Sequence, residues 1–223
     1  MNNQHAANTA MISFSSVSPG QEPEMINFVK EVVDKLLYYG IDIVTGASIF
    51  NNGLAEFFEE ILKKHDNRTT IEVCIPECLY EKYVTEENKD FIAILEETKR
   101  FSFCVISIPE NAEEDKGKNT LSNQLTAMRF YLVDNSGIFV MTGGKTEGYL
   151  GSMPGLEEEL RLVEEKIKHI ENKYIFLYDR FGGVINKERI KSVVSDYDPD
   201  SYALNLVDFG DMLENRRRSF IKH

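Results

Sequence analysis

The chain has few of the residues that build metal sites and disulfide frameworks. Its 223 residues include only four scattered histidines and three cysteines, Cys74, Cys78 and Cys104. An odd number of cysteines does not fit a set of paired disulfides, and the Cys74–Cys78 pair is interrupted by Pro76 with no second Cys or His pair after it. We therefore predict buried, reduced thiols in a cytoplasmic protein, with no metal site and no cofactor.

Long apolar runs and an excess of basic charge are also missing. No stretch approaches the roughly 20 apolar residues that a membrane-spanning helix needs, and residues 1–10 lack the apolar core of a signal peptide. Acidic residues outnumber basic ones by 37 to 25, which gives a net charge of −12. Proteins that bind nucleic acids usually show the opposite balance. We expect neither a membrane nor a nucleic acid as partner, whereas a small phosphorylated ligand depends only on local charges.

Strand-like apolar runs alternate with amphipathic helical segments along most of the chain. Strands are predicted over 11–17, 41–45, 70–75, 101–108, 137–142 and 173–178, and helices over 22–39, 54–64, 87–99, 120–133, 154–169 and 202–220. This alternation predicts an α/β fold with a doubly wound, mostly parallel sheet and helices on both faces, as in Rossmann-like proteins. We expect one such domain over residues 11–223, after a disordered tail over residues 1–10.

The segment between the fifth predicted strand and the next helix is rich in glycine. Five glycines fall within thirteen residues: Gly143, Gly144, Gly148, Gly151 and Gly155. Glycine lets a ligand approach the backbone closely, and the N–H groups that open the helix can bind an anion. We expect the loop to lie against a ligand, so that a side chain at Gly144 would clash with that ligand more than it would disturb the fold. The spacing matches neither a Walker A loop nor a dinucleotide fingerprint.

Other small residues follow neighbouring strands. Ser15, Ser16 and Gly46 lie at the ends of the first two strands, and Gly182 and Gly183 follow the sixth. Because ligands of open parallel sheets bind beyond the carboxyl ends of the strands, these residues are candidates for the same site.

The glycine-rich segment, taken as a spaced set, resembles a known family. Its pattern is Gly143-Gly144-Lys145, Gly148, Gly151, Pro154-Gly155 and Glu157-Glu158. It is similar to the signature of the SLOG superfamily, which joins the Smf/DprA proteins and the LOG phosphoribohydrolases. The spacing resembles the branch found beside TIR and other effector domains in bacterial antiviral systems. Met128-Arg129 and the Phe-Gly-Gly turn at 181–183 resemble that branch as well.

The resemblance implies a Rossmann-like fold and a nucleotide-derived ligand. Members of the superfamily either cleave a base–sugar bond or sense a nucleotide-derived signal such as a cyclic ADP-ribose-like messenger. In the sensing branch an Arg, a Lys and a Glu hold the ligand. The matching residues here are Arg129, Lys145 and either Glu157 or Glu158, with Glu158 preferred.

Two functions stay open at this point. The LOG hydrolase motif has a proline where this chain has Thr142, and residues 146–153 interrupt its spacing. We therefore favour a sensor that acts with an effector protein or domain, and we keep an N-glycosidic hydrolase or nucleoside sugar transferase as the alternative. A homodimer or larger oligomer is expected. Without a ligand role, Arg129 would be an ordinary ion-paired helical residue and the glutamates a helix N-terminal acidic cluster.

Overall fold

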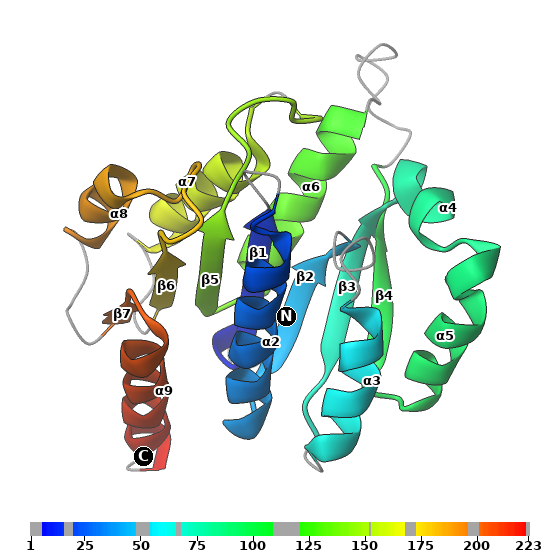
Figure 1. Cartoon of the computed structure of the whole chain (residues 1–223), viewed down its shortest axis with the longest axis horizontal. Helices are drawn as coiled ribbons and strands as arrows, with labels where there is room; N and C mark the ends of the chain where they lie inside the picture. The colour runs from blue at the N-terminus through cyan, green and yellow to red at the C-terminus, as the bar shows by residue number, and fades with distance from the viewer. Residues whose placement is uncertain are drawn as a thin grey trace.

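Parallel strands in a single sheet form the centre of the molecule. The computed structural model describes residues 6–15, 20–47, 54–65, 68–108, 121–151, 153–167, 173–195 and 201–221. Within these ranges the sheet has seven strands in the order β4-β3-β2-β1-β5-β6-β7 (Figure 1), and every neighbouring pair is parallel. The strands are β1 (Thr9–Ser15), β2 (Asp42–Gly46), β3 (Ile71–Pro76), β4 (Phe101–Ile106), β5 (Ile138–Gly143), β6 (Tyr174–Tyr178) and β7 (Tyr202–Ala203).

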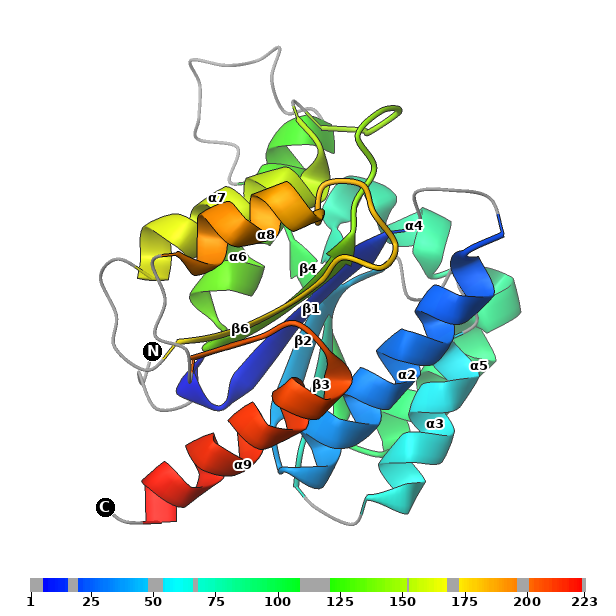
Figure 2. The same cartoon turned by 60° about the vertical axis from the view of Figure 1, so that its left-hand side comes forward.

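Helices cover both faces of this sheet, as Figure 2 shows. One face carries α2 (Glu22–Tyr38), α3 (Ala55–Lys64), α5 (Glu86–Glu97) and α9 (Leu206–Ile221). The opposite face carries α6 (Leu121–Asp134), α7 (Gly155–Ile167) and α8 (Lys187–Val194). A short 3-10 helix, η2 (Glu77–Leu79), and α4 (Tyr80–Tyr83) follow β3. The predicted doubly wound, Rossmann-like α/β fold is confirmed.

Alternation along the strands divides the core into two layers. In β1, Ile12 and Phe14 pack with the layer of α2 and α3, whereas Met11 packs with the layer of α6 and α7. In β5, Val140 and Met141 divide between the layers in the same way. Successive side chains of a strand point to opposite faces, so nearly continuous apolar runs such as these belong to strands that are covered on both sides.

The N-terminal boundary of the sheet differs from the sequence prediction. Strand β1 begins at Thr9, and both Thr9 and Ala10 are buried. These two residues therefore belong to the sheet and not to the tail predicted for residues 1–10. Thr9 is polar and gave no apolar signal. Residues 1–5 lie outside the described ranges.

Two elements near the C-terminal end were also missed. Helix α8 begins after Asn186, whose side chain accepts hydrogen bonds from the backbone N–H groups of Glu188 and Arg189 at 3.1 and 3.0 Å. Strand β7 has only two residues, too few for a periodic signal, and it occupies the start of the last predicted helix. That helix begins at Leu206 instead. In the described part of the chain, no helix combines the length and the hydropathy needed to cross a bilayer.

The sheet changes its direction of growth between β1 and β5. The chain moves outward from β1 to the β4 edge, crosses back to β5 beside β1, and then continues to β7. Ser15 and Gly143 are paired in register at the carboxyl ends of these two central strands. Such a switch point leaves a crevice between the connections on the two sides, where open α/β sheets bind their ligands.

Candidate functional site

A pocket lies at this switch point. Its cavity of about 260 Å³ is close to the lower end of the range for small-molecule sites. Residues from the ends of β1 and β2, from η2, from α6 and from α7 line it together with the glycine-rich loop after β5. Side chains that are far apart in the sequence therefore meet beyond the carboxyl ends of the strands.

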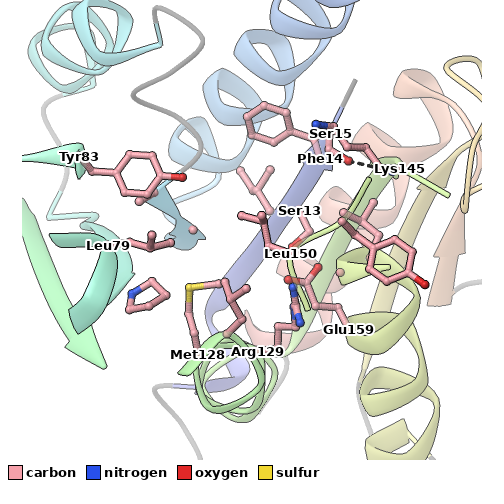
Figure 3. Close-up of a pocket in the computed structure, with 18 of the residues that line it drawn as sticks. Ser13, Phe14, Ser15, Leu79, Tyr83, Met128, Arg129, Lys145, Leu150 and Glu159 are labelled. Atoms are coloured by element: carbon pink, nitrogen blue, oxygen red, sulfur yellow. Dashed lines mark hydrogen bonds between the residues drawn. The ribbon is translucent and has the colours of Figure 1, made fainter. Parts of the chain in front are cut away.

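The two ends of the pocket differ in chemistry, as Figure 3 shows. At one end Leu79, Tyr83 and Met128 present apolar surface and an aromatic ring. At the other end Arg129, Glu159 and Lys145 present charged groups near β1 and the glycine-rich loop, with Ser13 and Ser15 beside them. Phe14 and Leu150 add apolar surface near the charged groups, so the pocket suits a ligand that has both polar and apolar parts.

Arg129 forms a largely buried ion pair at the charged end. Its side chain projects from α6 and is only 9% exposed, and its Nη1 atom donates to the Oε2 atom of Glu158 on α7. Thr126 donates a second hydrogen bond to Glu158, with 2.6 Å between Oγ1 and Oε1. Arg129 is thus ion-paired and also part of the pocket wall, and its contact with a ligand stays a prediction.

Two glycines of the loop make room for this guanidinium group. A Cβ atom at Gly155 would lie 2.8 Å from Nη2 of Arg129, and one at Gly151 would lie 3.2 Å from Nη1. The first contact is shorter than real Cβ atoms show and the second is tighter than most, so the guanidinium group would have to move to admit either side chain. Part of the glycine richness of the loop is therefore explained by the packing of Arg129.

Glu159 is the buried acid of the pocket. It is 6% exposed, and burial raises its pKa to about 7 even though the charge of Arg129 and a hydrogen bond from Ser13 favour the ionised form. Its Oε2 atom is buried and has no hydrogen-bond partner among the described residues. A buried polar atom without a partner is costly and calls for an explanation, and a ligand hydroxyl or amine group in the pocket would supply the missing hydrogen bond.

The glutamate on the pocket wall is Glu159 and not Glu158, the residue that the sequence favours. Consecutive helical residues point about 100° apart, so three adjacent glutamates face three directions. Glu157 points away from the pocket and pairs with Arg161 and Arg189 at 2.8 and 3.4 Å, while Glu158 pairs with Arg129. Only the phase of α7 relative to the sheet decides which glutamate faces the ligand, and the sequence alone does not give that phase.

The other candidate residues divide between the pocket wall and its surroundings. The wall includes Ser15, Gly46, Lys145, Gly148 and Gly155, and the backbone N–H of Lys145 donates to the Ser15 hydroxyl at 3.2 Å. The following candidates are not on the pocket wall: Gly143, Gly144, Gly151, Pro154, Glu157, Glu158, Gly182 and Gly183. Ser16 lies outside the described residues.

The model of the SLOG cluster2 family matches residues 22–206, which is most of the chain and includes both α6 and the glycine-rich loop. The chain belongs to this family. Membership in SLOG indicates a nucleotide-related function. A comparison with curated proteins gave no match.

Neighbouring protein atoms in the SLOG domain leave no room for a side chain at Gly144. Its φ is +102°, and a Cβ atom there would lie 2.7 Å from Cβ of Val184. Its N–H donates to the Ser15 carbonyl and its own carbonyl accepts from the N–H of Val184, both at 3.1 Å. The expectation that a side chain at Gly144 would meet the ligand before the protein is therefore wrong, because the loop after β6 already occupies that space.

We predict that Gly144→Ala lowers the free energy of unfolding by about 2 kcal/mol, from unfavourable backbone geometry together with the contact to Val184. Gly148→Ala is the matched control, since Gly148 also has a positive φ of +64° but nothing within 4 Å of a Cβ atom. Urea denaturation of the two variants of the SLOG domain measures the difference. Equal losses of stability would contradict the packing role of Gly144.

Proposed function

We propose that this SLOG domain is a sensor that binds a nucleotide-derived signalling ligand, of the NAD or cyclic ADP-ribose kind, in the pocket between β1 and β5. The observation that carries the proposal is the buried carboxyl group of Glu159, whose unpaired Oε2 atom lies at the pocket beside Arg129. Binding would be reported to an effector protein or domain in bacterial antiviral defence. The resemblance to the effector-associated branch supports this context, and the family match supports the nucleotide-related part of the proposal.

The chemistry of the two ends suggests how such a ligand is oriented. Lys145 is exposed at the rim and supplies a mobile positive charge for a phosphate group. Glu159 lies deeper and can accept a hydrogen bond from a ribose hydroxyl. Leu79 and Tyr83, at the opposite end, offer a surface on which a planar base can stack. This order of phosphate, sugar and base follows the pocket from its charged end to its apolar end.

A second function is supported by the same carboxyl group. A general acid or base works best when its pKa is near the ambient pH, and the pKa of Glu159 is raised to about 7. Cleavage of an N-glycosidic bond in a nucleoside monophosphate is therefore the alternative. We favour the sensor because Thr142 replaces the hydrolase proline and because the inserted loop places Tyr149 and Leu150 on the pocket wall.

The experiment that separates the two functions uses defined nucleotides. The purified protein is titrated with AMP, NAD, ADP-ribose and cyclic ADP-ribose by calorimetry, and each mixture is then analysed by chromatography for released free base. A sensor binds at least one of the NAD-derived compounds and leaves it intact. Release of base from AMP would replace the sensor with the hydrolase, and no binding of any of the four would contradict the assigned ligand class.

We predict that Lys145→Ala weakens binding of the phosphorylated ligand that the wild-type protein binds by about tenfold, the loss of one charge-assisted contact. The melting temperature should not change, because Lys145 is exposed. Lys191→Ala is the control, since it removes the same charge from an exposed position of α8 that does not line the pocket. Equal affinity of both variants and the wild type would remove Lys145 from the site.

A further inference from the structure

Two cysteines and a glutamate meet on the face of the sheet beneath α6. Glu72 and Cys74 are two residues apart on β3 and so point to the same side. Cys104 on β4 is the in-register neighbour of Cys74. The carboxylate and the two sulfur atoms all lie within 4.8 Å of one another. Cys78, which is close to Cys74 in the sequence, lies on η2 and is exposed, so the prediction of buried thiols is wrong for Cys78.

The surroundings of this cluster hold its ligand atoms in place. Cys74 is completely buried, whereas Glu72 and Cys104 are partly exposed and can be reached from solvent. Tyr131 of α6 donates a hydrogen bond to Glu72, with 2.9 Å between the hydroxyl and Oε1. This bond orients the carboxylate and leaves its second oxygen available. Outer hydrogen bonds of this kind are typical of metal ligands, whose orientation they fix.

We propose that Glu72, Cys74 and Cys104 form a binding site for a thiophilic divalent cation such as Zn²⁺. Two thiolates and one carboxylate are a ligand set that suits Zn²⁺, with solvent in the fourth tetrahedral position. Tetrahedral bonds of about 2.3 Å to sulfur place two thiolates about 3.8 Å apart, so only small side-chain movements are needed from the observed arrangement. Hard cations such as Mg²⁺ and Ca²⁺ prefer oxygen ligands and would not use the two sulfur atoms.

A cation bound at this site would link two strands of the sheet to a helix. It would join β3 to β4, the edge strand of the sheet, and through Tyr131 it would restrain α6. The same helix carries Met128 and Arg129 to the nucleotide pocket. The cation site shares no residue with that pocket, so the two proposals stand or fall separately.

The test is a titration of the reduced, chelator-treated protein with Co²⁺, which reports thiolate ligands through a charge-transfer absorption. We expect one equivalent of Co²⁺ to produce this absorption and Zn²⁺ to abolish it by displacement. Cys104→Ser should weaken Co²⁺ binding by about 100-fold or more, and Tyr131→Phe, which removes the orienting hydrogen bond, by about tenfold.

Cys78→Ser is the matched control, because it removes an exposed thiol outside the cluster and should leave the titration unchanged. Circular dichroism of each variant checks that the fold is intact, and Cys104, which is partly exposed, is a safer position for substitution than the buried Cys74. Failure of the wild-type protein to develop the charge-transfer band would overturn the site. Survival of the band in folded Cys104→Ser, or its loss in Cys78→Ser, would do the same.

Discussion

Glu159→Gln is expected to stabilise the protein above neutral pH and to weaken ligand binding. The folded-state pKa of Glu159 is raised from 4.5 to about 7, mainly by burial. The folded protein therefore holds a proton that the unfolded chain releases, so the contribution of Glu159 to stability is complete below pH 4.5 and is lost as the pH rises to 7. Glutamine is neutral at every pH and avoids this loss.

The size of the effect follows from the shift of the pKa. A shift of this size corresponds to about 3 kcal/mol of unfolding free energy, which the variant should gain over the wild type at pH 8 and not at pH 4. Urea denaturation at the two pH values measures it. Ligand affinity should fall by about 100-fold, since a hydrogen bond to a charged group is lost, and the wild-type affinity should increase with pH near 7 if the ionised carboxylate accepts from the ligand.

Two results would contradict this prediction. Equal stability of the variant and the wild type at pH 8 would mean that burying the ionised carboxylate of Glu159 does not destabilise the folded protein. Unchanged ligand affinity in the folded variant would mean that the unpaired Oε2 atom does not face the ligand.

Glu158→Gln is expected to have the opposite effect on stability, although its position is adjacent. Glu158 neutralises Arg129, and the two side chains are 12% and 9% exposed. Removing one partner of a buried ion pair leaves an uncompensated charge, at a cost of about 3–5 kcal/mol. We expect a correspondingly lower midpoint of urea denaturation at neutral pH, where the pair is intact in the wild type.

Glu157→Gln provides the control on the same turn of α7. Its partners include Arg161, which is 60% exposed, so the loss should be about 1 kcal/mol or less. The double variant Arg129→Gln, Glu158→Gln should regain part of the stability that Glu158→Gln loses, because no unpaired charge remains. If the Glu157 and Glu158 variants unfold at the same urea concentration, the buried ion pair does not stabilise the fold as described.

The sequence was sufficient to predict the architecture because hydrophobic periodicity records burial directly. The apolar residues of α2 recur every three or four positions and are buried in the structure. The apolar run at 101–108 contains the edge strand β4, whose residues are mostly partly exposed, so there the apolar character predicts the strand but not its burial. The two elements that the sequence did not predict are short. Helix α8 has eight residues and buries only Ile190 and Val193, and β7 has two residues that pair with β6.

The site was predictable at the level of loops and less so at the level of single atoms. Strand order places the glycine-rich loop beside Ser15 and Gly46, which parallel topology implies. The direction in which the Glu159 side chain points depends on the rotation of α7 about its axis. The contact between Cys74 and Cys104 depends on the register of β3 and β4. Neither quantity is contained in residue spacing, and both arise from contacts between elements that are distant in the chain.

The pairing of β1 with β5 has a consequence for how the protein folds. Ser15 of β1 pairs with Gly143 of β5, and more than half of the chain lies between these two residues. The partners in β1 and β2, such as Thr9 and Asp42, are much closer in the sequence. Closing so long a loop costs more entropy than the local pairings, and such non-local contacts slow folding. The seam that forms the pocket should therefore close late, and a nucleotide that binds there should retard unfolding more than it accelerates folding.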